Sequence, residues 1–151
     1  MKTRKAKLRD AKGIHQMINQ ASQTDSVIPR SLAEIYESIR DFFVAEESGR
    51  LAGCCALHVD WEDLAEVRSL VVAPKEQRKG LGGKLLKAAL REAKALEVPK
   101  VFVLTSKPQF FQKQGFEKIR RGRLPHKVWG DCLKCPKFPK CDEVALWKLL
   151  S

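Results

Sequence analysis

The stretch Glu66–Thr105 restricts the fold more than any other part of the sequence. An apolar run stops at Pro74, a glycine-containing loop follows, and from Leu81 onward apolar residues recur at helical spacing. After Pro99, the compact apolar sequence KVFVLT is typical of a buried strand. Strand, glycine loop, helix and strand in this order predict an α/β domain with a ligand site at the carboxyl end of the first strand.

The flanking segments also show helix and strand patterns, with no repeat, linker or domain boundary, so we expect residues 1–151 to form one domain. We expect a strand at Lys5–Leu8 and then a helix that begins after Asp10, with one apolar face made of Ile14, Met17, Ile18 and Ala21. A second helix capped by Ser31 and Glu34 should follow, and then a hairpin that turns at Glu47–Arg50. Near the end of the sequence we expect a short helix closed by Gly115 and a last strand at Glu143–Leu150.

The chain carries a formal net charge of +11, which favours anionic partners. We find no helix-turn-helix and no aromatic strand motif for reading bases, which argues against nucleic acid as the partner. No apolar run approaches the roughly 18 residues of a membrane span, and the basic start lacks the apolar core of a signal peptide. The sequence thus predicts a cytoplasmic protein, and it leaves a homodimer open.

The loop from Gln77 to Gly83 has the composition of a phosphate-binding turn. Its three glycines allow close backbone approach to an anion, the first turn of the helix offers unpaired N–H groups, and three cations surround it. These residues are Gly80, Gly82 and Gly83, with Arg78, Lys79 and Lys84. The spacing fits neither a Walker A loop nor the dinucleotide-binding fingerprint.

Taken with its strand, this loop reads V-x-P-x-x-Q-R-x-G-x-G, which resembles the acetyl-CoA signature of the GCN5-related N-acetyltransferase (GNAT) superfamily. The later FFQKQGF resembles the superfamily's closing helix and Gly-Phe. The resemblance implies a mixed, twisted sheet flanked by helices and splayed open beside the Glu66–Val72 strand to admit acetyl-CoA. It assigns cofactor contacts to Leu70, Val71, Val72, Gln77, Arg78, Lys79, Gly80, Leu81, Gly82, Gly83, Lys84 and Phe111.

The same resemblance implies direct attack of an amine on the thioester, helped by a backbone N–H that we assign to Val71. The amine must first lose a proton, and Glu66 is our candidate base, with His58 or water as alternatives. The superfamily's usual tyrosine acid is replaced by phenylalanine, which leaves Ser106 as a weak donor. Strand alternation would place Glu66, Arg68, Leu70 and Val72 on one face.

Within the superfamily, the sequences VIPRSLAEI and AEVRSLVVAPKEQRKGLG resemble the acetyltransferase domain of N-acetylglutamate synthases. This implies that Arg30 binds a carboxylate of glutamate, a role suited to the planar guanidinium, with Arg68 as a second candidate. Further candidates for the other carboxylate are Lys107, Arg121 and Lys127. Another amine, on a metabolite, a protein N-terminus or a lysine, remains an alternative acceptor.

A cysteine-containing segment, residues 126–142, precedes the last expected strand. Cys132, Cys135 and Cys141, with His126, have the spacing of a structural zinc site. An iron–sulfur cluster, a redox sensor and plain buried thiols remain open, as does a binding knuckle that would make the chain a non-catalytic nucleic-acid or protein-binding module.

Overall fold

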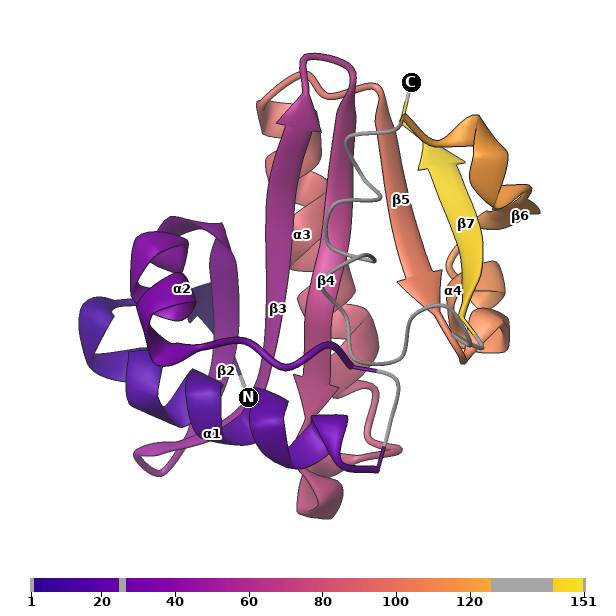
Figure 1. Cartoon of the computed structure of the whole chain (residues 1–151). Coiled ribbons are helices and arrows are strands. Elements are labelled where there is room, and N and C mark those ends of the chain that lie inside the picture. Colours follow the sequence, from indigo (N-terminus) through magenta and orange to yellow (C-terminus); the bar gives the residue numbers. More distant parts are fainter. Residues whose placement is uncertain (1, 25–26, 126–142, 151) are drawn as a thin grey trace.

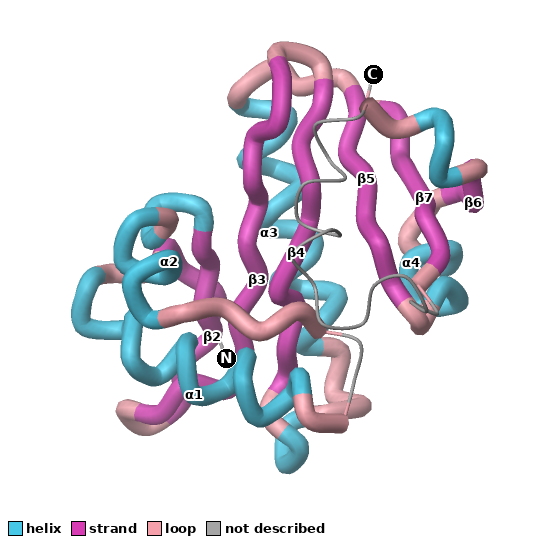
Figure 2. Tube along the Cα trace, in the orientation of Figure 1, coloured by secondary structure: helices cyan, strands magenta, loops and turns pink. Residues whose placement is uncertain are grey.

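The computed structural model describes residues 2–24, 27–125 and 143–150, which form one seven-stranded mixed sheet with helices on both faces (Figure 1, Figure 2). The strand order is β1-β2-β3-β4-β5-β7-β6. The strands are β1 (Lys2–Lys5), β2 (Phe42–Glu47), β3 (Arg50–Trp61), β4 (Leu64–Val72), β5 (Lys100–Thr105), β6 (Glu117–Ile119) and β7 (Val144–Leu149). The α-helices are α1 (Ala11–Ser22), α2 (Leu32–Glu37), α3 (Leu81–Ala95) and α4 (Pro108–Lys113), and short 3-10 turns lie at Leu8–Asp10, Ile39–Asp41, Pro74–Glu76 and Arg121–Arg123.

The helices divide between the two faces of the sheet, each over its own apolar core. Helices α3 and α4 cover one face, where Leu85 and Leu86 are fully buried. Helices α1 and α2 cover the other, where Ile14 and Ile18 of α1 are also fully buried. This arrangement confirms the helical faces expected from the sequence.

Strands β4 and β5 run parallel but pair over a very short length. Their register contains only Ala65 with Val101 and Glu66 with Phe102, although β4 continues to Val72 and β5 to Thr105. Figure 1 shows the two strands diverging beyond this point. The predicted splayed sheet is therefore confirmed, and β7 restores regular antiparallel pairing along all of β5.

A bulge interrupts β4 just where it leaves β5. Cys54 of β3 pairs with Val71 and Ala56 pairs with Arg68, so two residues of β4 stand opposite one residue of β3. Ser69, one of the two, has a φ of +56°, a left-handed conformation that is rare outside glycine.

The bulge reverses the alternation of side chains, so the predicted common face of Glu66, Arg68, Leu70 and Val72 is wrong. Leu70 and Val72 pack with Val67 on the α3 face. Arg68 lies opposite Ala56, which belongs to the core under α1 and α2, and Val71 belongs to that same core. One extra residue in a strand moves every later side chain to the other face.

The predicted strand at Lys5–Leu8 is also displaced, because β1 ends at Lys5 and Leu8 begins a 3-10 turn. The Asp10 carboxylate accepts the backbone N–H of Lys7 at 2.7 Å and binds the Arg4 guanidinium at 2.8 Å. These contacts hold the chain in a turn where apolar alternation alone suggested a strand.

The other predicted boundaries agree closely with the structure. Ser31 caps α2, since its hydroxyl accepts the N–H of Glu34 at 3.1 Å and the capping box is complete. The β2–β3 turn uses positive φ values at Ser48 and Gly49, as two-residue hairpin loops require. The short strand β6 was not predicted. No helix in the described parts of the chain is both long and apolar enough to span a bilayer.

Candidate functional site

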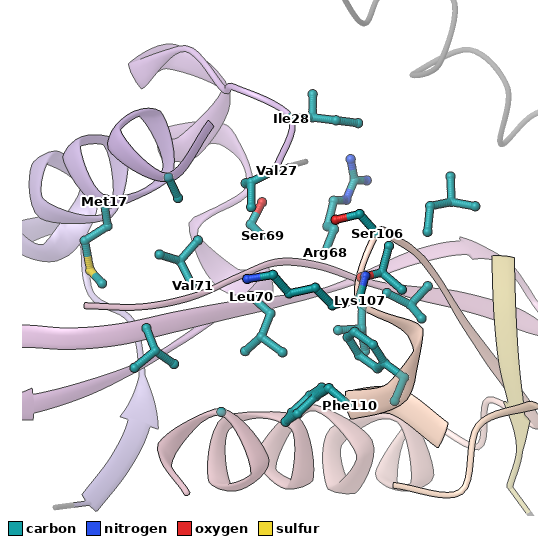
Figure 3. Close-up of a pocket in the computed structure, with 18 of the residues that line it drawn as sticks. Met17, Val27, Ile28, Arg68, Ser69, Leu70, Val71, Ser106, Lys107 and Phe110 are labelled. Atoms are coloured by element: carbon teal, nitrogen blue, oxygen red, sulfur yellow. The ribbon is translucent and has the colours of Figure 1, made fainter. Parts of the chain in front are cut away.

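A cavity of about 450 Å³ occupies the gap between β4 and β5. Figure 3 shows Ser69, Leu70 and Val71 along one wall, Ser106, Lys107 and Phe110 along another, and Met17, Val27 and Ile28 on the side of α1. The cavity brings together ten of the residues predicted for the site: Arg30, Glu66, Arg68, Leu70, Val71, Val72, Gln77, Arg78, Gly82 and Phe111. Lys79, Gly80, Leu81, Gly83 and Lys84 belong to the neighbouring loop and helix start and do not line it.

The backbone of β4 presents different groups to the cavity than the sequence suggested. Ala73 donates its N–H to Ala52 of β3 at 2.8 Å. The backbone groups of Val71, two residues earlier, face the same way, since its N–H hydrogen-bonds toward the Cys54 sulfur of β3. The groups of Leu70 and Val72 consequently face away from β3. This is a correction to the assignment of Val71 as the donor N–H, because Val71's N–H is directed at β3 rather than at the cleft.

The glycine loop is shaped by two residues with a left-handed backbone conformation and by one side-chain hydrogen bond. Arg78 and Gly80 have φ values of +66° and +81°, and α3 begins directly after them. Gln77 donates its side-chain amide to the carbonyl of Val72 at 3.1 Å, which ties the loop to the end of β4. Gln77 was expected to bind cofactor, and the structure adds this structural contact. The loop therefore aims the first turn of α3, with its unpaired N–H groups and positive dipole end, at the mouth of the cavity.

Two of the arginines that line the cavity form ion pairs, and the charged lining residues are Arg30, Glu66, Arg68, Arg78, Lys107 and Glu143. Arg68 Nε lies 3.7 Å from Glu66 Oε1, and both side chains are largely buried at 17% and 12% exposure. Arg30, at 13% exposure, pairs with Glu34 of α2 at 3.6 Å. The carbonyl of Arg30 accepts the side-chain amide of Asn19 at 3.2 Å, so α1 fixes the backbone that carries this guanidinium.

The other candidates divide between the cavity and its surroundings. Ser106 and Lys107 line the cavity, and the N–H of Lys107 donates to Thr105 Oγ1 at 2.9 Å. His58, the alternative base, lies outside the lining, and its Nδ1 is 2.9 Å from Asp41 Oδ2. Arg121 is not among the lining residues. Lys127 falls outside the described residues.

The phenylalanines of α4 form the wall between the cavity and the core. Phe110 and Phe111 meet edge to face with centroids 5.0 Å apart, and Phe111 meets Phe116 in the same way at 5.4 Å. A Cβ on Gly82 would stand 3.5 Å from the Phe110 ring, an ordinary van der Waals contact, so α3 and α4 lie close together at the opening.

Sequence reasoning missed the part of the wall that α1 and the chain after it supply. These residues are Met17, Gln20, Ala21, Thr24, Val27 and Ile28. Met17 and Ala21 were placed on the apolar face of α1 as core residues. They are only half-buried, unlike Ile14 and Ile18 on the same helix, and nothing in the sequence distinguishes the two pairs.

The proposed zinc ligands Cys132, Cys135, Cys141 and His126 lie outside the described residues. Within the residues that are described, no three His, Cys, Asp or Glu side chains gather as a metal site would require. The two described cysteines, Cys54 and Cys55, are buried on β3, and burial raises the pKa of the Cys54 thiol to about 12.

Comparison with known proteins agrees with this architecture. The sequence model described as "Acetyltransferase (GNAT) domain" matches residues 38–118, more than half of the chain. An uncharacterized N-acetyltransferase of Chlorobaculum tepidum is 40% identical over 97% of this chain and 95% of its own length. An amino-acid acetyltransferase of Mycobacterium tuberculosis is 34% identical over 85% of this chain and 75% of its own length.

Two solved structures extend the similarity to the whole chain. A Mycobacterium tuberculosis protein in complex with CoA and NLQ superimposes with a TM-score of 0.86 at 26% identity, over all of both chains. The N-acetylglutamate synthase of Neisseria gonorrhoeae, complexed with coenzyme A and N-acetyl-glutamate, gives a TM-score of 0.89 at 25% identity. That match covers 99% of this chain and 35% of the other. The chain therefore belongs to the GNAT acetyltransferase family and is an acetyl-CoA-dependent N-acetyltransferase.

Proposed function

We propose that the protein transfers the acetyl group of acetyl-CoA to the α-amino group of a small acidic amino acid, with L-glutamate the first candidate. The observation that carries the proposal is the pair of largely buried guanidiniums, Arg30 and Arg68, on one cavity whose other boundary is the glycine loop. The names of the relatives, amino-acid acetyltransferase and N-acetylglutamate synthase, support the same substrate class.

In this proposal the cosubstrate lies along the unpaired edge of β4. Its diphosphate binds at the start of α3, where the N–H groups of the first turn and the cations of the loop neutralise it. The pantetheine arm pairs with the backbone of Leu70 and Val72, the groups that β5 leaves available. Phe110 and Phe111 keep water from the far side of the arm.

The acceptor enters beside Arg30 and Arg68, which bind its carboxylates, and Lys107 supplies a further cation on the same cavity. Glu66 accepts a proton from the ammonium, directly or through one water. The nitrogen lone pair then attacks the thioester carbon while the N–H of Leu70 polarises the carbonyl oxygen. The C–S bond breaks, and coenzyme A leaves as a thiolate, which is a good leaving group because its conjugate thiol has a pKa of about 8.5. The nitrogen gives up its second proton to this thiolate, directly or through water, which leaves a neutral amide and a free thiol.

The test measures CoA release by chromatography, which avoids interference from the five cysteines of the chain. Purified protein receives acetyl-CoA and, separately, glutamate, glutamine, aspartate, neutral amino acids or a lysine-containing peptide. Saturable release with glutamate, lost in Arg30→Ala, supports the proposal. Arg91→Ala is the matched control, because Arg91 is exposed on α3 and outside the cavity. Release with the peptide alone refutes it in favour of protein acetylation.

A further inference from the structure

Cys54 of β3, which pairs with Val71 at the end of the bulge, makes a contact that the mechanism above does not use. Cys54 has no exposed surface, and its thiol donates to the carbonyl of Ser69 at 3.4 Å. Ser69 is the bulge residue with the left-handed backbone. A side chain of the neighbouring strand thus holds the strained residue of β4.

The carbonyl of Ser69 and the N–H of Leu70 belong to one peptide unit. A trans peptide is planar, and its carbonyl and N–H point in opposite directions. A hydrogen bond that fixes the direction of the Ser69 carbonyl toward Cys54 therefore also fixes the Leu70 N–H, pointing it away from Cys54. Accepting a hydrogen bond at the carbonyl also polarises the peptide and strengthens its N–H as a donor.

We propose that Cys54 is a positioning residue of the transferase: its thiol holds the Ser69–Leu70 peptide so that the Leu70 N–H faces the thioester carbonyl in the cleft. The inference rests on the proposed function, because it concerns the N–H assigned there to the oxyanion. Cys54 itself touches neither cosubstrate nor acceptor.

The thiol is suited to this task because it stays protonated. Burial raises the pKa of Cys54 to about 12, an effect that the Val71 backbone hydrogen bond only partly offsets. At physiological pH the group is therefore a hydrogen-bond donor, whereas a thiolate would repel the Ser69 carbonyl. Cys54 packs in the core under α1 and α2, with Ile14, Val44 and Val71 among its neighbours.

The next residue provides a matched control. Cys55 is equally buried, belongs to the core under α3, and directs its thiol at the carbonyl of Ala56 at 3.9 Å rather than at the bulge. Burial raises the pKa of this thiol as well. Replacing either cysteine by alanine removes one buried sulfur from β3, but only one of the two changes removes the contact to Ser69.

The experiment compares Cys54→Ala, Cys54→Ser and Cys55→Ala in the full chain, with the amine on which the wild type is active. One lost hydrogen bond predicts a kcat about three- to tenfold lower for Cys54→Ala, with the KM for acetyl-CoA within about twofold of wild type. Serine retains a donor and recovers at least about half of the wild-type kcat. Cys55→Ala keeps its kcat within about twofold while losing similar stability to urea.

Three results would overturn the inference: an unchanged kcat in Cys54→Ala, an equal loss in Cys55→Ala, or no recovery with serine. If Cys54→Ala does not fold, Cys54→Val removes the donor while keeping the core filled, and the same criteria apply to it. A wild type that releases no CoA with any amine refutes the proposed function and this inference together. An active wild type with an unaffected Cys54→Ala refutes the inference alone.

Discussion

Gly80 and Gly83 of the glycine loop are predicted to respond to alanine in opposite directions. Gly80 has a φ of +81°, and a Cβ added there would meet nothing within 4 Å. Replacing Gly80 by alanine should therefore lower the free energy of unfolding only through backbone strain, by about 1–2 kcal/mol for an L-residue held in the left-handed region. Gly83 lies inside α3 with no positive φ, and its Cβ would make only an ordinary contact 3.6 Å from Gln114 Nε2. Alanine there should stabilise the helix by up to about 1 kcal/mol.

Urea denaturation of Gly80→Ala and Gly83→Ala, monitored by circular dichroism, measures both differences on the same helix start. Calorimetry with acetyl-CoA provides the second readout. If Gly80→Ala relieves its strain by moving the loop away from the ligand, the same 1–2 kcal/mol appears as a Kd about 5- to 30-fold higher. The reasoning is refuted if Gly80→Ala keeps both the stability and the acetyl-CoA Kd of the wild type, or if Gly83→Ala is less stable than the wild type.

Other predictions concern the loss of stability at acid pH, the proposed general base Glu66 and the core under α3. The hydrogen bond from Arg4 lowers the pKa of Asp10, with help from the Lys7 N–H and against the opposing effect of burial. The carboxylate of Asp10 therefore adds to the free energy of unfolding at pH values above its ordinary pKa of about 3.9. This stabilisation is lost as the pH falls through the lower pKa of the folded state. Asp10→Asn should therefore cost about 1–3 kcal/mol in urea denaturation at pH 7 and almost nothing near pH 2; an equal cost at both pH values would contradict the ion-pair explanation. Glu66→Gln should lower kcat by about 10²- to 10⁴-fold without abolishing acetyl-CoA binding by calorimetry, and an unchanged kcat would assign the proton to water. Leu86→Ala, at a fully buried position of α3, should cost about 2–5 kcal/mol in the same denaturation assay, and a cost below 1 kcal/mol would show that the core can collapse around it.

The sequence predicted the framework of this fold because its elements carry strong local signals. The β2–β3 turn, the Ser31 cap and the strand Lys100–Thr105 each follow from residue type and spacing within a few positions. The strand β6 did not, because three residues have too little pattern and are held in place by pairing with β7.

The sequence located the glycine-loop side of the cavity and missed the α1 side for a related reason. The loop is a contiguous motif, whereas Met17 and Val27 reach the cavity through the packing of α1 on the sheet, which no local pattern encodes. The bulge at Ser69 is the clearest case. Serine has no marked preference for a left-handed backbone, so an inference from alternation assigned Leu70 and Val72 to the face of Arg68. The assignment of the donor N–H to Val71, which followed the family resemblance, did not anticipate the bulge either.

The short pairing of β4 with β5 makes the sheet behave, in its middle, like a sheet with a free edge. Such edges invite other extended chains, and most proteins cover or charge them. Here the edge lies inside the molecule, between α1 and α4, and the cavity of about 450 Å³ runs along it. If the proposed function holds, acetyl-CoA completes the sheet as a surrogate strand. The melting temperature should then rise with cosubstrate concentration, because a ligand that binds the folded state and not the unfolded chain stabilises the folded state by mass action.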